Sequence, residues 1–155
     1  MANFVPNIAK GRVAELYDRV KGGDPAASRL YVIPVAAGSV TDEQMTDADT
    51  LADIITLGVS ELTTGGWNRK TLAAADIATG GPDDANNRND RSLPTQTWTG
   101  VSGSASTDLI VCYAAVASPT NAQLVPLTVF DFVQTPSGAD ITMTGGVFFR
   151  ASAPA

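Results

Sequence analysis

The hydrophobic pattern of the chain is organised around residues 109–116, a run of consecutive apolar side chains. Turn-forming residues flank it, at 100–108 before and 118–121 after. A short apolar run with such borders is typical of a strand rather than a helix. Because both faces of this strand are apolar, we predict that it lies at the centre of a sheet. A second layer should cover one side, and a helix or a partner subunit the other.

The N-terminal pattern has a different period. Residues 4–7 are predicted to form an extended arm, with Asn7 as the cap of a helix that begins at Ile8. Apolar residues then recur on one helical face, at Ala9, Val13, Leu16, Tyr17 and Val20. Gly22 and Gly23 end the helix. Gly11, inside it, costs about 1 kcal/mol relative to Ala and indicates either a close backbone approach or a tolerated glycine.

Further apolar or alternating segments predict strands at residues 30–35, 67–77, 95–101, 124–134 and 140–150. Pro34 cannot donate to a ladder, so the first of these is expected at a sheet edge or at a bulge. Residues 50–55 predict a short helix within an acidic stretch whose default interpretation is a solvated face. Residues 82–91 have the composition of a polar loop.

The predicted fold class is therefore mainly β with an N-terminal α-helix, arranged as an antiparallel β-sandwich or barrel. Residues 1–23 form the arm and helix, and residues 24–155 the β-rich part of a single compact domain. A length of 155 residues is sufficient for a substantial core.

Composition narrows the classes of partner. The formal net charge is −6, which argues against nonspecific binding to nucleic acid or to an anionic membrane. Charged residues make up 17% of the chain, against roughly 25% in ordinary soluble domains. A surface so poor in charge suits a protein partly covered in an assembly. The sequence has no apolar run long enough for a transmembrane helix and no pattern of a signal peptide.

The residues needed for common chemistry are missing. The chain has no histidine and a single cysteine, Cys112. These counts exclude Ser-His-Asp and Cys-His arrangements, histidine metal sites, and zinc or iron–sulfur centres built by this chain. Cys112 lies in the middle of the central apolar run, so we expect a buried and inert thiol. We accordingly predict no enzyme activity, no cofactor and no metal.

Three features keep other functions open. The oxygen-rich residues 83–90 resemble a calcium loop in composition, but Arg88 and the absence of EF-hand spacing favour a hydrogen-bonded loop. Trp67 and Trp98 could form a sugar-binding platform, although buried core aromatics are more common. A hydrolase would need paired carboxylates, whose geometry the sequence does not show.

Several segments resemble small virion structural proteins of tailed phages of actinobacteria. They are residues 7–20, 67–72, 82–88, 93–98, 107–113 and 146–150. Together they cover most of the chain outside residues 24–63, a region that is variable in this family. None of them is a catalytic motif, so the resemblance indicates kinship rather than a site.

The resemblance implies a capsid decoration or head-fibre component. We expect it to bind the major capsid protein on the outside of the head, after assembly in the host cytoplasm, and to add interface that resists internal DNA pressure. A homo-oligomer is expected, with a trimer favoured because capsid lattices offer local three-fold axes.

The candidate residues for capsid or subunit contact are Phe4, Val5, Ile8 and Tyr17. The alternative at these positions is that the helix simply packs on its own sheet. For the whole protein, the alternatives are a minor tail or fibre-base protein and a carbohydrate-binding module.

Overall fold

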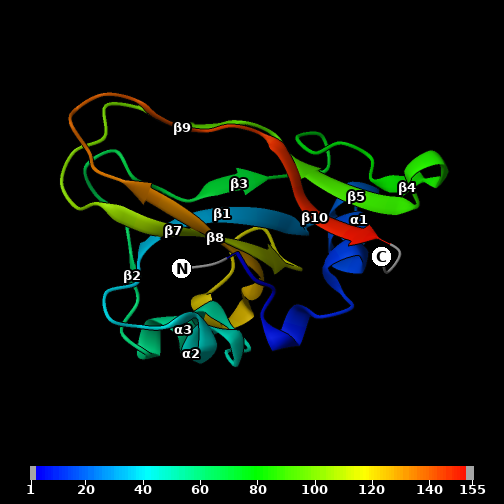
Figure 1. The fold of residues 1–155 in the computed structure, drawn as a ribbon, viewed down its shortest axis with the longest axis horizontal. Coiled ribbons are helices and arrows are strands. Elements are labelled where there is room, and N and C mark those ends of the chain that lie inside the picture. Colours follow the sequence, from blue (N-terminus) through cyan, green and yellow to red (C-terminus); the bar gives the residue numbers. More distant parts are fainter. Residues whose placement is uncertain (1–2, 153–155) are drawn as a thin grey trace.

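The computed structural model describes residues 3–152 and shows a mainly β fold with antiparallel sheets and an N-terminal helix, as predicted (Figure 1). The helices are α1 (Val13–Gly22), α2 (Asp42–Thr46) and α3 (Leu51–Thr56), with 3₁₀ turns η1 (Asn7–Ala9), η2 (Asp84–Asn86) and η3 (Asn121–Gln123). The strands are β1 (Arg29–Ala36), β2 (Ser60–Glu61), β3 (Lys70–Leu72), β4 (Gly81–Asp83), β5 (Arg88–Leu93), β6 (Gln96–Trp98), β7 (Ser106–Ala114), β8 (Val125–Gln134), β9 (Ile141–Met143) and β10 (Gly146–Ser152).

The predicted central strand is β7, which pairs with β1 on one side and with β8 on the other. Its bounds differ from the prediction. It starts earlier, because Ser106 already pairs with Gln134 of β8, and it ends at Ala114. Ala115 and Val116 lie beyond its end and are exposed.

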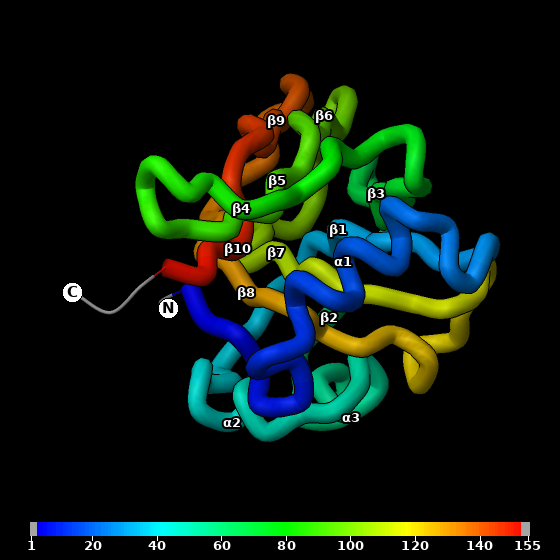
Figure 2. Tube along the Cα trace, turned by 90° about the vertical axis from the view of Figure 1, so that its right-hand side faces the viewer, coloured from blue at the N-terminus to red at the C-terminus, as the bar shows by residue number. Residues whose placement is uncertain are grey.

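Each face of β7 contributes to a separate hydrophobic core, which confirms that both faces are covered. Leu109, Val111 and Tyr113 belong to a core shared with α1, β5 and β6. Ile110, Cys112 and Ala114 belong to a core shared with α2 and α3. Figure 2 shows β4, β5, β6, β9 and β10 on one side of the large sheet and α2 and α3 on the other. The smaller sheets β10-β5-β4 and β6-β9 are antiparallel, an arrangement compatible with a sandwich.

The N-terminal helix begins later than predicted. Residues 7–9 form the 3₁₀ turn η1, and the α-helix starts only at Val13. Between them Gly11 has φ +80°, a left-handed conformation that residues with a Cβ rarely adopt. Asn7 does not cap the helix, because its side-chain amide donates to Asp47 Oδ1 at 2.6 Å. Gly11 is thus the break between arm and helix.

The rest of the helix follows the prediction. Val13, Leu16, Tyr17 and Val20 are all buried, so the apolar face is the face that packs. Gly23 ends the helix in the left-handed conformation, and its N–H donates to the carbonyls of Arg19 and Val20.

Pro34 lies inside the sheet, in a strand that pairs on both sides and has no register shift against β7, so the prediction of an edge or a bulge was wrong. The Pro34 carbonyl accepts from Leu62 N at 2.9 Å, on the side of β1 away from β7. A strand residue directs its N and O to the same side, so the missing N–H faces that side too. There, β3 pairs only with residues 30–32 and β2 only with residues 35–36. The proline therefore occupies a gap between two short partners.

Two predicted strands are shorter than expected. Residues 67–77 contain only β3, because Asp76 accepts from Ala73 N at 2.8 Å in a turn that ends the strand. Residues 95–101 contain only β6. In contrast, β8 matches the predicted 124–134, and α3 matches the predicted helix and has a capping box of Thr50 and Asp53.

Two further segments have a different secondary structure from the one predicted. Residues 140–150 form two strands, β9 and β10, separated at Gly145, whose N–H donates to Thr95 Oγ1 and whose backbone lies against residues 93–95. The predicted polar loop at 82–91 is instead the hairpin of β4, η2 and β5. The acidic stretch also contains α2, which was not predicted.

Candidate contact surface

The N-terminal arm lies on the outer edge of the large sheet. Phe4 and Val129 of β8 exchange two backbone hydrogen bonds, of 3.0 and 2.9 Å. Beside them, the Asn3 side-chain oxygen accepts from Asp131 N at 3.0 Å. Since β8 is the last strand of the sheet, the arm adds a short piece of strand to an edge.

Three of the four predicted contact residues lie along this arm. Phe4, Val5 and Ile8 are half-buried against the two cores, so part of each side chain remains at the surface.

Tyr17 is different, because its side chain is fully buried. Its hydroxyl lies 2.8 Å from the carbonyl oxygens of both Ala78 and Ser92, and burial raises its pKa. No surface of Tyr17 is left for a partner, which corrects its place among the contact residues. It belongs to the alternative expectation, that the helix packs on its own sheet.

Four of the five phenylalanines gather around one apolar groove beside the arm. Phe4 borders this groove, but its side chain packs with Val129 against the core on the α2 and α3 face of the sheet. The groove consists of two adjoining cavities of about 200 and 220 Å³. Phe130, Phe132 and Phe148 line the first, and Phe4, Phe130, Phe148 and Phe149 line the second. These residues come from the arm, β8 and β10, so no local sequence pattern indicates that they meet.

Two edge strands border this groove. β8 ends the large sheet, and β10 ends the sheet β10-β5-β4. Val147 of β10 lines the first cavity and is 47% exposed. The arm covers the edge of β8 at Val129 and Asp131. The groove therefore combines the exposed side chain of Val147 with the outer edge of β10, which is typical of a contact surface.

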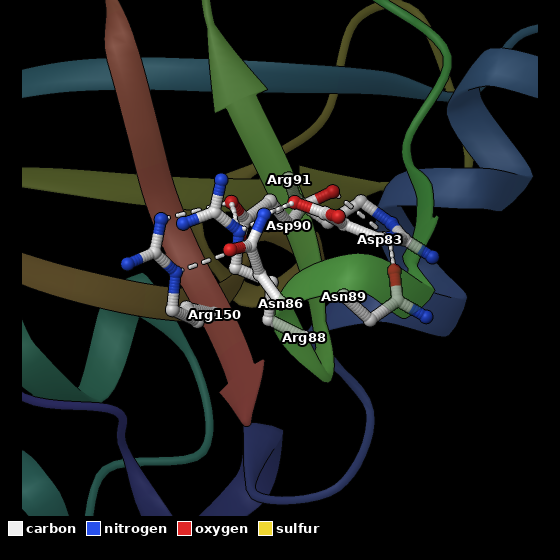
Figure 3. Close-up of polar contacts among 7 residues, drawn as sticks. All are labelled: Asp83, Asn86, Arg88, Asn89, Asp90, Arg91 and Arg150. Carbon is white, nitrogen blue, oxygen red and sulfur yellow. Dashed lines mark hydrogen bonds and ion pairs between the residues drawn. The ribbon is translucent and has the colours of Figure 1, made fainter. Parts of the chain in front are cut away.

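A charged network covers the hairpin beside β10 (Figure 3). Arg150 binds Asp90 through two hydrogen bonds of 2.7 and 2.9 Å. Arg88 Nε lies 2.9 Å from Asp83 and 3.3 Å from Asp90. The hydrogen bond from Asn86 and the nearby Arg88 lower the pKa of Asp83, and Arg150 lowers the pKa of Asp90.

This network argues against a calcium site in residues 83–90. The carboxylates of the oxygen-rich segment are paired with arginines instead of converging on an open centre. Within residues 3–152, no group of three or more His, Cys, Asp or Glu side chains is arranged to hold a metal ion. The geometry supports the hydrogen-bonded interpretation of this segment.

Arg91 ties the same hairpin to α1. Its side chain is almost fully buried, donates to Asp18 Oδ2 at 2.6 Å and also binds the side chain of Asn89. The guanidinium lies 5.9 Å from the centre of the Tyr17 ring. Arg91 thus anchors the second layer of strands to the helix, a role that the sequence did not indicate.

Trp67 and Trp98 form no platform. Both are buried, with ring centres 5.5 Å apart in an edge-to-face arrangement. Their indole N–H groups donate to the backbone carbonyls of Ser104 and Asn68. A sugar-binding site made from these rings is therefore excluded, which removes the feature on which the carbohydrate-binding alternative was based.

Two buried titratable groups on β7 have a raised pKa. Cys112 is fully buried as predicted, and burial strongly raises the pKa of its thiol. Asp108 is also buried, although no sequence pattern predicted this. Its Oδ2 accepts from Thr107 Oγ1 at 2.6 Å, while Oδ1 has no hydrogen-bond partner among the described residues. Burial raises the pKa of Asp108, and the charge of Asp131, opposite it on β8, adds to this shift.

Comparisons with protein-family models, with curated proteins and with solved structures gave no match. In the described part of the chain, no helix is long and apolar enough to cross a membrane.

Proposed function

We propose that this chain is a phage virion structural protein that decorates the outside of the head shell. One structural observation supports the proposal most: the arm and four of the five phenylalanines border a single surface groove. Apolar and aromatic residues dominate the energetics of protein interfaces, so this groove suits a binding partner. The resemblance of residues 7–20 and 146–150 to virion proteins indicates the kind of partner.

The proposed mechanism is noncovalent. The chain binds the major capsid protein and, as a homo-oligomer, spans neighbouring shell subunits. The added interface then resists the pressure of the packaged DNA. Such a role needs no catalytic group, cofactor or metal, and the protein acts in the assembled virion.

We propose that the arm contacts the capsid together with the groove. Phe4 lines the second cavity, and Val5 lines it as well. Removing residues 1–7 takes away both side chains and uncovers the edge of β8 at Val129.

The test is co-sedimentation with phage heads that have been stripped of this protein. Full-length protein should pellet with heads in a saturable way. A chain that lacks residues 1–7 should bind at least tenfold more weakly, about 1.4 kcal/mol. Equal binding of both chains would remove the arm from the contact.

Purified tails, tested in parallel, address the second candidate. A minor tail or fibre-base protein has the same expected features of low charge and an apolar contact surface. Binding to tails without binding to heads would replace the decoration proposal with the tail proposal.

A further inference from the structure

We propose that residues 81–90 form a flap that ion pairs hold on the fold, so that high salt or acid releases it while the rest of the domain stays folded. The flap consists of β4, η2 and the first half of β5. Figure 1 shows it at one end of the molecule. The device is a property of the chain itself and is independent of the proposed function.

The flap has no apolar packing of its own. None of residues 81–90 is buried, and none of their side chains belongs to either hydrophobic core. Segments with few buried apolar contacts open at a lower free energy than the core of the same domain. Backbone pairing and side-chain charges therefore hold this part of the sheet in place.

The boundary of the flap is sharp, because the next residue is an anchor. Arg91 is almost fully buried and donates to Asp18 of α1 at 2.6 Å. The backbone of Gly80 lies so close to Arg91 that a Cβ at Gly80 would overlap its side chain. Both ends of the flap thus start from one fixed point, and opening should stop there.

Ion pairs connect the three strands at the free end of this sheet (Figure 3). Arg88 Nε of β5 lies 2.9 Å from Asp83 Oδ2 of β4 and 3.3 Å from Asp90 Oδ2. Arg150 of β10 binds both oxygens of Asp90, at 2.7 and 2.9 Å. A partly exposed pair is weak by itself and is screened by salt, so the cohesion of the flap should depend on ionic strength.

The two carboxylates make the same contacts sensitive to acid. The hydrogen bond from Asn86 and the charge of Arg88 lower the pKa of Asp83, and Arg150 and Arg88 lower the pKa of Asp90. A carboxylate whose pKa is lowered by folding stabilises the folded form above its ordinary range. This contribution is lost as the pH falls through the folded pKa. Acid should therefore release the flap.

The neighbouring charged groups do not replace these pairs. Asp84 of η2 is exposed and adds only negative charge, and Asp18 of α1 binds Arg91 at the base of the flap. Asp83 and Asp90 are therefore the titratable groups whose protonation breaks the network.

Release of the flap would also change the groove. The side chain of Arg150 lines the second cavity, and Asp90 holds its guanidinium. Loss of this pair frees a positive charge at the rim of the groove. The network thus couples the free end of the hairpin to the candidate contact surface.

The first experiment measures amide hydrogen exchange of the wild-type protein at pH 7 in 0.1 M and 1 M sodium chloride. The screening length falls from about 10 Å to about 3 Å between these conditions. We expect protection of the amides in residues 81–90 to fall at least about threefold. Protection in α1 should change little, because its buried apolar face holds that helix.

The second experiment compares two carboxylate-to-amide substitutions. Asp90→Asn removes the charge that binds Arg88 and Arg150. Glu15→Gln is the matched control, because Glu15 pairs with Arg19 on the surface of α1, at 3.0 Å. Asp90→Asn should lower the protection of the flap at low salt and weaken its salt dependence, whereas Glu15→Gln should leave the flap unchanged. In the wild type, lowering the pH from 6 to 3 should have the effect of Asp90→Asn, after correction for intrinsic exchange rates.

Three results would overturn the proposal. The flap could keep its protection in high salt and in Asp90→Asn, which would show that charge does not hold it. It could lack protection under every condition, which would show that the ion pairs hold nothing. Finally, the flap and β7 could lose protection together, which would show that residues 81–90 are not a separate unit.

Discussion

At the scale of single residues, the aromatic side chains divide into two groups. All three tyrosines and both tryptophans are buried, each at most 6% exposed. Of the five phenylalanines, only Phe148 is buried, and the other four keep part of their surface exposed. Because Phe has no polar group that must be satisfied, burial would cost it nothing. Three of these four, Phe130, Phe132 and Phe149, therefore form a partly exposed apolar surface around the groove, whereas Phe4 packs against the other core.

Cys112 gives a test of the central strand. A buried thiol with a raised pKa contains almost no reactive thiolate, so a thiol reagent should label it fully only after denaturation. Cys112→Asp should destabilise the fold strongly, because it buries a carboxylate among apolar groups. Rapid labelling of the native protein would show that the strand opens readily.

Asp108 should make stability depend on pH. Its pKa is raised in the folded state, so ionised Asp108 destabilises the fold, and this penalty disappears as the pH falls through the folded pKa. Asp108→Asn should therefore raise the free energy of unfolding near pH 7 by up to about 1 kcal/mol. The gain should vanish at a pH below the ordinary range of Asp. Denaturant unfolding at both pH values measures it, with Asp131→Asn as a comparison, and a loss of stability at pH 7 would contradict the assignment.

At the scale of elements, the sequence predicted those whose apolar periodicity is strong. β7, β8, α3 and the apolar face of α1 were predicted, because their apolar side chains recur at the strand or helix period and pack against the hydrophobic cores. The hairpin of β4 and β5 was not predicted, because its residues are polar and a polar composition is typical of a loop. In the structure these polar residues form a strand pair that is supported by ion pairs such as Arg88–Asp83. The prediction from Pro34 was wrong because a strand tolerates proline wherever its missing N–H has no partner strand. At Pro34 this depends on where β2 and β3 end, which the local sequence does not show.

The break between arm and helix can be tested with two glycines. Gly11→Ala should destabilise the protein by about 1–2 kcal/mol, because φ +80° is unfavourable for alanine. Gly22→Ala should be neutral or stabilising by up to about 1 kcal/mol, because Gly22 is helical and a Cβ there meets nothing within 4 Å. Thermal or denaturant unfolding measures both, and a stabilising Gly11→Ala would show that α1 continues into the arm.

At the scale of the whole molecule, two layers cover the central sheet, and partly exposed apolar side chains gather in the groove at its edge. The helices α2 and α3 cover one face, and α1 with the smaller sheets covers the other (Figure 2). The groove lies where the edges of two sheets meet. Its position could not be predicted, because the fold brings residue 4 next to residues 130 and 148, which lie far apart in the sequence. Hydrophobic periodicity indicates local structure only. Of the four predicted contact residues, the structure leaves Phe4, Val5 and Ile8 at the surface and buries Tyr17.

The most direct test of the proposed function is to locate the chain in the virion. The protein would carry a bulky tag at its C-terminus, which follows the exposed Ser152, and tagged phage would be imaged by electron microscopy. The account predicts additional density at regular positions over the outside of the head. Density confined to the tail, or virions that lack the tagged chain altogether, would contradict it.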